Sequence, residues 1–295
     1  MDRKYKLTDE KKVLDDGTVL YRIQALRDFN LVNGKEVKVG DLGGWVESES
    51  NLSHDGESWI GDEAMVRGNA KVGKSALVFE NANIYDSAHV KDMAQVYGDA
   101  SVYGNACVFE GAKVYDDALI FGSALVFGVA QVYGLSMVFN SANVAGSAQV
   151  CDSARIYGNA QVYDKAKISS YALVYGNAEV FDNAQIYGYA KIHDYAKIYD
   201  NTKVYCNADV NGRAEIGGNA IVNEEYDYAV FQNTWSSRRW FTYTHSNKMW
   251  KVGCFYGTGE ELIAKAYKDS ELSGKCYEAI VRTQEAIDKA LRKEK

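Results

Sequence analysis

The sequence has no proline, no paired cysteine motif and no long apolar run. Zero prolines in 295 residues is unusual, since average usage of about 5% would give about fifteen. The five cysteines occur without a CxxC motif or any metal-ligand spacing, which indicates free thiols. No stretch of eighteen apolar residues could span a membrane, and the first residues lack the apolar segment of a secretion signal. We therefore expect a cytosolic protein.

In place of these features the sequence has a six-residue repeat. From Ala64 to Val222 the chain runs through 27 consecutive hexads without insertion or deletion. Position 1 of the hexad is Ala in 25 of them, the exceptions being Ser136 and Thr202, and position 3 is always Val or Ile. Small and branched residues alternate with variable and aromatic ones. This alternation is typical of a short strand with one buried face.

Position 5 of the hexad is where the chain is expected to turn. Of the 26 such positions from Gly68 to Gly218, 21 are Gly, Asp or Asn, which tolerate positive φ. Four-residue strands joined by two-residue bends predict a coil of 18 residues with three strands. The 27 hexads then form nine coils spaced about 4.8 Å apart. Residues 58–63 keep the same register, so we expect the coils to begin at residue 58.

The two ends of the chain lack the repeat and are predicted to be separate units. Residues 1–57 are expected to form a β cap on the first coil, with a hairpin around Asp16-Gly17. Residues 223–295 are expected to form a small α+β domain, in which a capping box at Thr258 opens a helix. Its expected elements are strands within 226–235, 238–246 and 249–257 and helices at 258–268 and near 275–292.

The hexads resemble those of the hexapeptide-repeat proteins, and this resemblance implies a mainly β fold, the left-handed parallel β-helix. The flanking phrases YRIQALRDF, VGDLGGWVESESNLS and GCFYGTGEELIAKA look like a family of uncharacterised hexapeptide-repeat proteins from bacteria and their phages. That family implies a phage or prophage setting in the cytoplasm of a bacterial host. Hexapeptide-repeat proteins commonly pack as parallel trimers, and they include acyltransferases and nucleotidyl-sugar enzymes.

Catalysis is one hypothesis to test against the residues. Acyl transfer needs a general base, usually His, in a cleft. His89 and His193 are expected on different faces nearly six coils apart, so they cannot share a zinc ion within one subunit, and His54 and His245 are expected in ordinary turns. No loop interrupts the repeat to wall a cleft, and no nucleotide or nucleophile motif is present. We therefore expect binding without a cofactor or metal, in preference to catalysis.

Aromatic residues at position 4 recur on all three expected faces, so they indicate a wall and not a site. Between residues 119 and 139, however, eight outward positions are apolar, which is more than a monomer normally exposes. We expect this belt to be buried in a homo-oligomer, most simply a trimer, with a foreign partner as the alternative. The belt consists of Leu119, Phe121, Leu125, Phe127, Val129, Leu135, Met137 and Phe139.

A second candidate surface follows the repeat, in the phrase NTWSSRRW. Guanidinium groups beside flat indole rings suit the phosphate and base of a nucleotide-like ligand. The alternative is that the tryptophans form the core of the C-terminal domain. Residues 58–222 hold 12 basic and 17 acidic residues, so long nucleic acid is not expected. The candidate ligand residues are Trp235, Arg238, Arg239, Trp240, Lys248 and Trp250.

These patterns predict a non-enzymatic, oligomeric binding protein. With the setting that the resemblance implies, the hypothesis is a phage or prophage protein that interferes with a host process. It would do so by sequestering a nucleotide-like ligand or by docking on a host protein. Two alternatives stay open: an acyl- or nucleotidyl-type transferase with a site between subunits, and a structural component of a phage.

Overall fold

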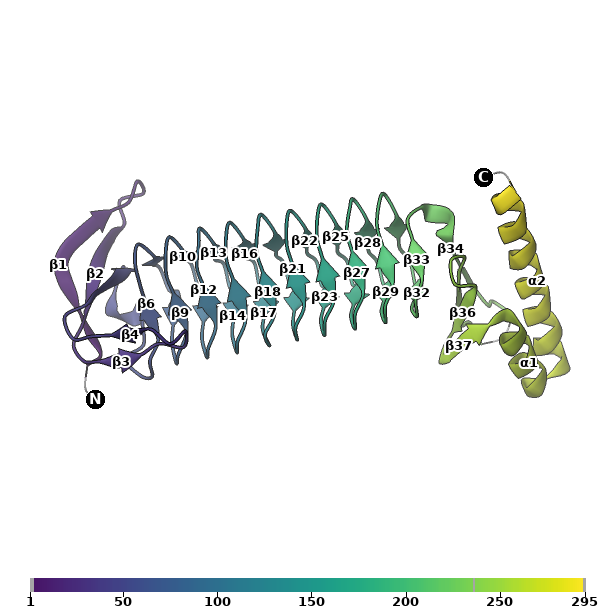
Figure 1. Ribbon diagram of the computed structural model, residues 1–295, viewed down its shortest axis with the longest axis horizontal. Helices are drawn as coiled ribbons and strands as arrows, with labels where there is room; N and C mark the ends of the chain where they lie inside the picture. The colour runs from purple at the N-terminus through teal and green to yellow at the C-terminus, as the bar shows by residue number, and fades with distance from the viewer. Residues whose placement is uncertain (1–2, 236, 294–295) are drawn as a thin grey trace.

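The computed structural model describes residues 3–235 and 237–293 (Figure 1). A parallel β-helix forms the long axis of the molecule, with a β-rich cap at the N-terminal end and a small sheet with two helices at the other end. The strands of the β-helix are two residues long, starting with β6 (Trp59–Ile60), β7 (Met65–Val66) and β8 (Lys71–Val72) and recurring every six residues to β33 (Ile221–Val222). The predicted fold class is confirmed.

The hexad explains the strands directly. The Ala at position 1 and the Val or Ile at position 3 are buried along the whole β-helix, where they form its core. The assigned strands are shorter than the four residues expected, but the hydrogen-bonded ladder extends past them. The N–H of Phe121, at position 4, donates to the carbonyl of Val138 one coil later at 3.0 Å. Each coil is therefore stabilised by a continuous set of bonds to its neighbours.

The turns occur at position 5 as predicted. Every residue at this position from Gly68 to Gly218 has φ between 55° and 73°, including the less tolerant Lys74 and Cys206. In many coils the side chain of an acidic corner residue accepts a hydrogen bond from the corner N–H one coil later. The Asp152 carboxylate and the Ser170 N–H form such a bond at 2.8 Å. Acidic corner residues thus partner backbone groups that the ladder leaves unpaired.

The outward residues at position 4 form stacked columns. Tyr157 and Tyr175 lie with ring centroids 4.9 Å apart, and His193 continues the same column 4.7 Å beyond Tyr175. Columns of this kind occur on all three faces, for example at Phe109–Phe127 and at Tyr115–Tyr133. Because the rings are distributed over all three faces, they are consistent with a structural role on the outside of the β-helix and not with a binding site.

The N-terminal cap continues one sheet of the β-helix. Its elements are β1 (Tyr5–Val13), β2 (Val19–Ala25), β3 (Phe29–Asn30), β4 (Glu36–Val37), β5 (Leu42–Val46) and the short 3-10 helix η1 (Glu49–Asn51). The hairpin expected around Asp16-Gly17 is present between β1 and β2. Strand β2 pairs antiparallel with β5, and β5 pairs in parallel with β7. The cap therefore covers the open edge of the first coil.

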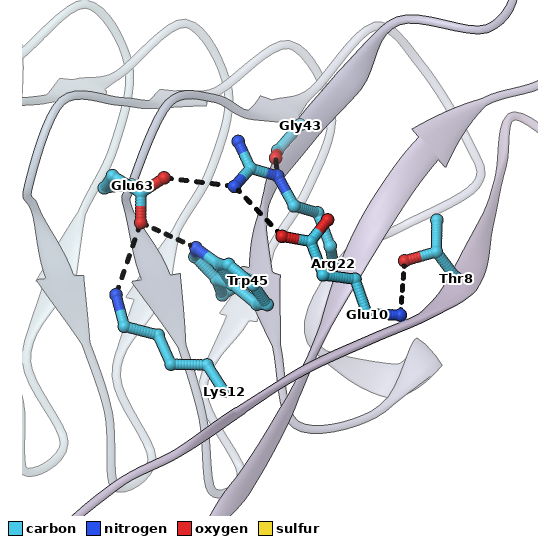
Figure 2. Close-up of polar contacts among 7 residues, drawn as sticks. All are labelled: Thr8, Glu10, Lys12, Arg22, Gly43, Trp45 and Glu63. Atoms are coloured by element: carbon cyan, nitrogen blue, oxygen red, sulfur yellow. Dashed lines mark hydrogen bonds and ion pairs between the residues drawn. The ribbon is translucent and has the colours of Figure 1, made fainter.

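One charged cluster fastens the hairpin to the coil (Figure 2). The Trp45 ring lies between the side chains of Lys12 and Arg22, whose cationic groups are 5.4 and 5.0 Å from ring centroids of Trp45. The Glu63 carboxylate accepts from the Trp45 indole N–H at 3.0 Å, from Lys12 at 3.3 Å and from Arg22 at 3.1 Å. These contacts tie β1, β2, β5 and the first coil together.

Within the described residues, the C-terminal unit contains one 3-10 helix, four strands and two α-helices. They are η2 (Glu225–Asp227), β34 (Tyr228–Gln232), β35 (Trp240–Thr244), β36 (Met249–Val252), β37 (Phe255–Thr258), α1 (Gly259–Asp269) and α2 (Glu271–Lys293). The third expected strand is split in two by a turn at Gly253, whose φ is 56°. The capping box at Thr258 is confirmed. Helix α2 begins earlier than expected because the Ser270 hydroxyl accepts from the Ser273 N–H at 3.1 Å.

This unit covers the last coil of the β-helix. The Thr242 hydroxyl accepts a hydrogen bond from the Glu215 N–H at 3.0 Å, and the Ser246 hydroxyl accepts from the Ile221 N–H at 2.7 Å. Polar side chains thus replace the strand that a further coil would have supplied. In the part of the chain that the structure describes, neither helix is long and apolar enough to cross a membrane.

Candidate functional site

The apolar belt does not form one continuous patch. Leu119 on β16 (Leu119–Ile120) and Met137 on β19 (Met137–Val138) are paired neighbours in the twelve-stranded sheet, and Phe121 and Phe139 stack beside them at 4.8 Å. The remaining members follow other strands. Leu125 and Phe127 belong to β17 (Leu125–Val126) and its end in the nine-stranded sheet, whereas Val129 and Leu135 lie at turns and are 58% and 61% exposed.

This arrangement divides the belt between faces of the prism. We call Leu119, Phe121, Met137 and Phe139 the first-face patch. All four are half-buried in the isolated chain. A cyclic trimer buries one face of each subunit, so the first-face patch suits that contact and the other belt residues need a separate explanation.

Four of the candidate ligand residues gather on one hairpin. Trp235, Arg238, Arg239 and Trp240 lie on the connection from β34 to β35 or at the start of β35, and all four are exposed. The two indoles are 45% and 36% exposed. The hairpin is held by its backbone, since the Asn233 N–H donates to the Arg239 carbonyl at 2.8 Å. We call these four residues the Trp/Arg hairpin.

The other two candidates are placed differently. Trp250 is completely buried, with Phe241 and Tyr243 around it, and forms part of the core of the C-terminal unit. Its assignment as a ligand residue is therefore wrong. Lys248 is exposed, but it lies in the turn between β35 and β36, at the opposite end of β35 from Trp240. It does not belong to the Trp/Arg hairpin.

A histidine and a carboxylate meet at the junction of the C-terminal unit and the β-helix. His245 Nδ1 and Asp288 Oδ1 are 2.6 Å apart, and both side chains are buried. Asp288 comes from α2, and His245 follows β35, so 43 residues of sequence separate the pair. They line a pocket of about 320 Å³ together with Ile221, Asn223, Tyr226, Asp227, Ser246 and Leu291. A carboxylate at Nδ1 fixes the orientation of an imidazole.

A second groove lies at the other end of the molecule, where the cap meets the first coils. It has a volume of about 500 Å³ and brings His54 and His89 together. Leu52 pairs with Val72, and Ile60 pairs with Val78. The two partners on the next coil are six positions apart in the sequence, as in every later hexad, but Leu52 and Ile60 are eight positions apart. The extra residues form a loop that walls the groove. This two-residue excess is the sequence signal that could have revealed it.

His193 has a structural explanation. Its Nε2 lies 2.8 Å from Asp209 Oδ1, and its ring ends the aromatic column on Tyr175. It follows a strand of the twelve-stranded sheet, whereas His89 is in the nine-stranded sheet, so their expected separation is confirmed. Within residues 3–235 and 237–293, no three His, Cys, Asp or Glu side chains converge to hold a metal ion.

Comparison with known proteins gives one partial similarity. No family model matches the chain. The chain is 33% identical over 84 residues to the Uncharacterized acetyltransferase YdcK of Escherichia coli (strain K12), a match that covers 24% of this chain and 24% of that protein. The β-helix and this partial match both fit a hexapeptide-repeat family, and the match spans about a quarter of that relative's length.

Proposed function

We propose that the protein is an oligomeric binding protein that presents the Trp/Arg hairpin to a small nucleotide-like ligand. The observation that carries the proposal is the exposure of Trp235 and Trp240 beside two exposed arginines on one hairpin. The core of the C-terminal unit is built from other aromatic residues, among them Trp250, so the two exposed indoles are not needed to fill it. Indole faces stack on bases, and guanidinium groups bind phosphates.

The β-helix serves in this proposal as a rigid spacer and assembly surface. The first-face patch joins the subunits of a trimer, which places three Trp/Arg hairpins at the same end of the assembly. The acidic surface of the β-helix disfavours long nucleic acid and leaves a small ligand as the better match. The phage setting, the location in a bacterial host's cytoplasm and the interference with a host process are implied by the family resemblance and stay predictions.

Titration of the full chain with mononucleotides and cyclic nucleotides, followed by calorimetry, tests the hairpin. The expected result is binding that Trp235→Ala or Arg239→Gln weakens at least tenfold. The control is Lys167→Gln, at an exposed basic residue on β24 (Lys167–Ile168), in a different sheet from the first-face patch. Equal affinity in the wild type and both hairpin variants would refute the assignment. So would the absence of binding at millimolar nucleotide.

A second candidate function is acyl transfer with His245 as general base. The 2.6 Å contact between His245 and Asp288, beside a pocket of about 320 Å³, favours it. In this candidate Asp288 orients the imidazole, which accepts a proton from the attacking group of an acceptor substrate. The E. coli relative is named an acetyltransferase, which adds support of a weaker kind because the match is short.

Release of free thiol from acetyl-CoA in the presence of amine or alcohol acceptors tests this second candidate. His245→Gln should abolish turnover, and Asp288→Asn should lower it with less effect on acetyl-CoA binding. His193→Gln is the matched control, because His193 also contacts a carboxylate but sits on the wall of the β-helix. Turnover that survives in His245→Gln would remove His245 as the base.

A further inference from the structure

The groove at the N-terminal end of the β-helix has the chemistry of an anion site. The loop that walls it is held close to the coil by Gly56, whose φ is 72°; a Cβ there would lie 2.3 Å from the Lys74 carbonyl oxygen. The position therefore requires glycine. The charged and imidazole side chains that line the groove are Glu49, His54, Asp55, Lys71, His89 and Lys91.

We propose that this groove binds the phosphoryl group of a small phosphorylated molecule, held by Lys71, Lys91 and the His54 ring. This site is separate from the Trp/Arg hairpin and goes beyond the proposed function. Its volume, about 500 Å³, lies within the range of small-molecule sites, roughly 300–1,000 Å³. The phosphoryl group fills only part of that space, so the ligand carries a further moiety.

His54 supplies a directed donor. Its Nδ1 accepts a hydrogen bond from the backbone N–H of Lys4 at 3.3 Å. A neutral imidazole has one donor and one acceptor nitrogen, so the proton is assigned to Nε2. That Nε2 is buried and has no hydrogen-bond partner within the described residues. The ring is held in place by stacking on Tyr5 at 4.4 Å. A buried N–H without an acceptor is unfavourable, and a small displacement of the loop that lets a ligand oxygen reach Nε2 would satisfy it.

Burial keeps His54 neutral. Partial desolvation lowers the pKa of its imidazole, and the charges of Lys4 and Arg3 act in the same direction against the opposing effects of Glu49 and Asp55. The ring is therefore a neutral N–H donor at pH 7, which is the form that the Lys4 contact requires. Neutral donors beside cationic groups are a common way to bind an oxyanion.

Lys71 and Lys91 supply positive charge that no carboxylate neutralises within the described residues, although the Lys91 ammonium also lies over the Phe109 ring, 5.2 Å from its centroid. Neither forms an ion pair with any described residue, whereas Lys74, close by, is paired with Asp92. Both lysines lie close enough to His89 for their charges to lower its pKa. Lys71 on β8 and His89 on β11 (His89–Val90) are direct neighbours in the parallel ladder. Two positive charges therefore lie near His89 in the groove, and both would attract a phosphate dianion.

Two carboxylates also line the groove, and neither cancels this charge. Glu49 is already paired with Arg3 at 3.3 Å. Asp55 is exposed on the loop, where solvent screens it. Beyond the groove the β-helix is acidic overall, which repels a polyanion such as nucleic acid. The site therefore selects a small anion over a long one.

Calorimetric titration of the full chain with inorganic phosphate and with pyrophosphate tests the proposal. We expect millimolar or tighter binding, weakened at least tenfold in the double variant Lys71→Gln/Lys91→Gln. The matched control is Lys167→Gln, at an exposed lysine on β24 (Lys167–Ile168) in another sheet, which should bind as the wild type does. His54→Phe keeps an aromatic ring on Tyr5 but removes the donor, and should also weaken binding.

The outcomes separate the proposal from its competitors. Unchanged affinity in the double lysine variant, or no binding of either probe at millimolar concentration, would overturn it. Equal affinity for citrate would also overturn the phosphoryl assignment, because the groove would then recognise carboxylates. The variant Arg238→Gln/Arg239→Gln should leave groove binding intact. A loss of phosphate binding in that variant alone would assign the anion to the Trp/Arg hairpin and refute the groove.

Discussion

The corner carboxylates make a sharp prediction about how the β-helix is stabilised. The change is Asp152→Gly. Asp152 has a φ of 57°, and its carboxylate accepts a hydrogen bond from the Ser170 N–H at 2.8 Å. The matched control is Asp164→Gly. Asp164 has the same φ of 57°, the same hexad position and a similarly exposed side chain, but its carboxylate forms no hydrogen bond among the described residues.

The expected magnitude follows from the difference between the two sites. Relief of positive φ and the added freedom of glycine in the unfolded chain are common to both and cancel in the comparison. A hydrogen bond to a charged group contributes about 1.5–3 kcal/mol, and exposure of Asp152 reduces this to about 1 kcal/mol. Loss of about 1 kcal/mol corresponds to roughly fivefold faster exchange of the amide that loses its partner.

Hydrogen exchange followed by NMR is the assay. In Asp152→Gly the Ser170 amide should exchange about fivefold faster, while the Tyr171 amide, bonded to the Gly188 carbonyl at 2.9 Å, should keep its rate. In Asp164→Gly the Ser170 rate should not change. Two results would refute the reasoning: Ser170 exchange that is the same in all three proteins, or equal acceleration of Ser170 and Tyr171, which would mean that the coil opens as a unit.

Three further predictions concern the cap, the first-face patch and the groove. Burial lowers the pKa of Lys4 to about 8 from 10.5, so the unfolded chain binds more protons than the folded chain between pH 8 and 10.5. The free energy of unfolding of the cap should therefore rise by about 1.5 kcal/mol from pH 8 to about 9.5 in urea melts, and Lys4→Met should remove this rise. In light scattering, Phe121→Asp should convert the proposed trimer to monomers. Tyr115→Asp, on another face of the β-helix, should leave the trimer intact. A wild-type protein that is already a monomer would contradict the proposed trimer. Partial burial and the charges of Lys71 and Lys91 lower the pKa of His89. Its other polar neighbours are Cys107, His54, Glu49 and Asp55. His89 should gain a proton on acidification, so sulfate should bind more tightly at about pH 5 than at pH 7.5. His89→Gln should reduce this dependence, and His54→Phe/His89→Gln should abolish it, because His54 also titrates in the groove.

The β-helix could be predicted from the sequence because one short pattern determines both its strands and its corners. Val or Ile at position 3 always faces inward, and the corner residues adopt positive φ even where Lys74 or Cys206 replaces the preferred types. The start of α2 was missed because Ser270 is one of many serines, and its capping role depends on where α1 ends. Strands and turns are predicted well where the same residue pattern recurs in many hexads, because an exception in one hexad does not obscure the pattern.

The candidate ligand residues were harder to predict, since exposure depends on how the strands pack. Trp250 and Lys251 alternate along β36, so they face opposite sides, and this alternation was a usable sign that Trp250 is buried beside an outward lysine. No comparable sign joins His245 to Asp288, because their contact depends on where α2 lies against the turn after β35. Contacts between distant elements of a non-repeating unit leave no period in the sequence.

Interruptions of the hexad repeat are the positions at which a binding site can form on the β-helix. An uninterrupted β-helix has flat faces without grooves. On such a face of this protein, the outward His193 stacks on Tyr175 as part of an aromatic column. The two extra residues between Leu52 and Ile60 change this locally. They lift a loop from the wall, bring His54 to the coil that carries His89, and leave a buried N–H that the ladder does not satisfy. If the groove binds an anion, deleting two residues of this loop to restore the hexad should abolish binding and leave the later coils intact.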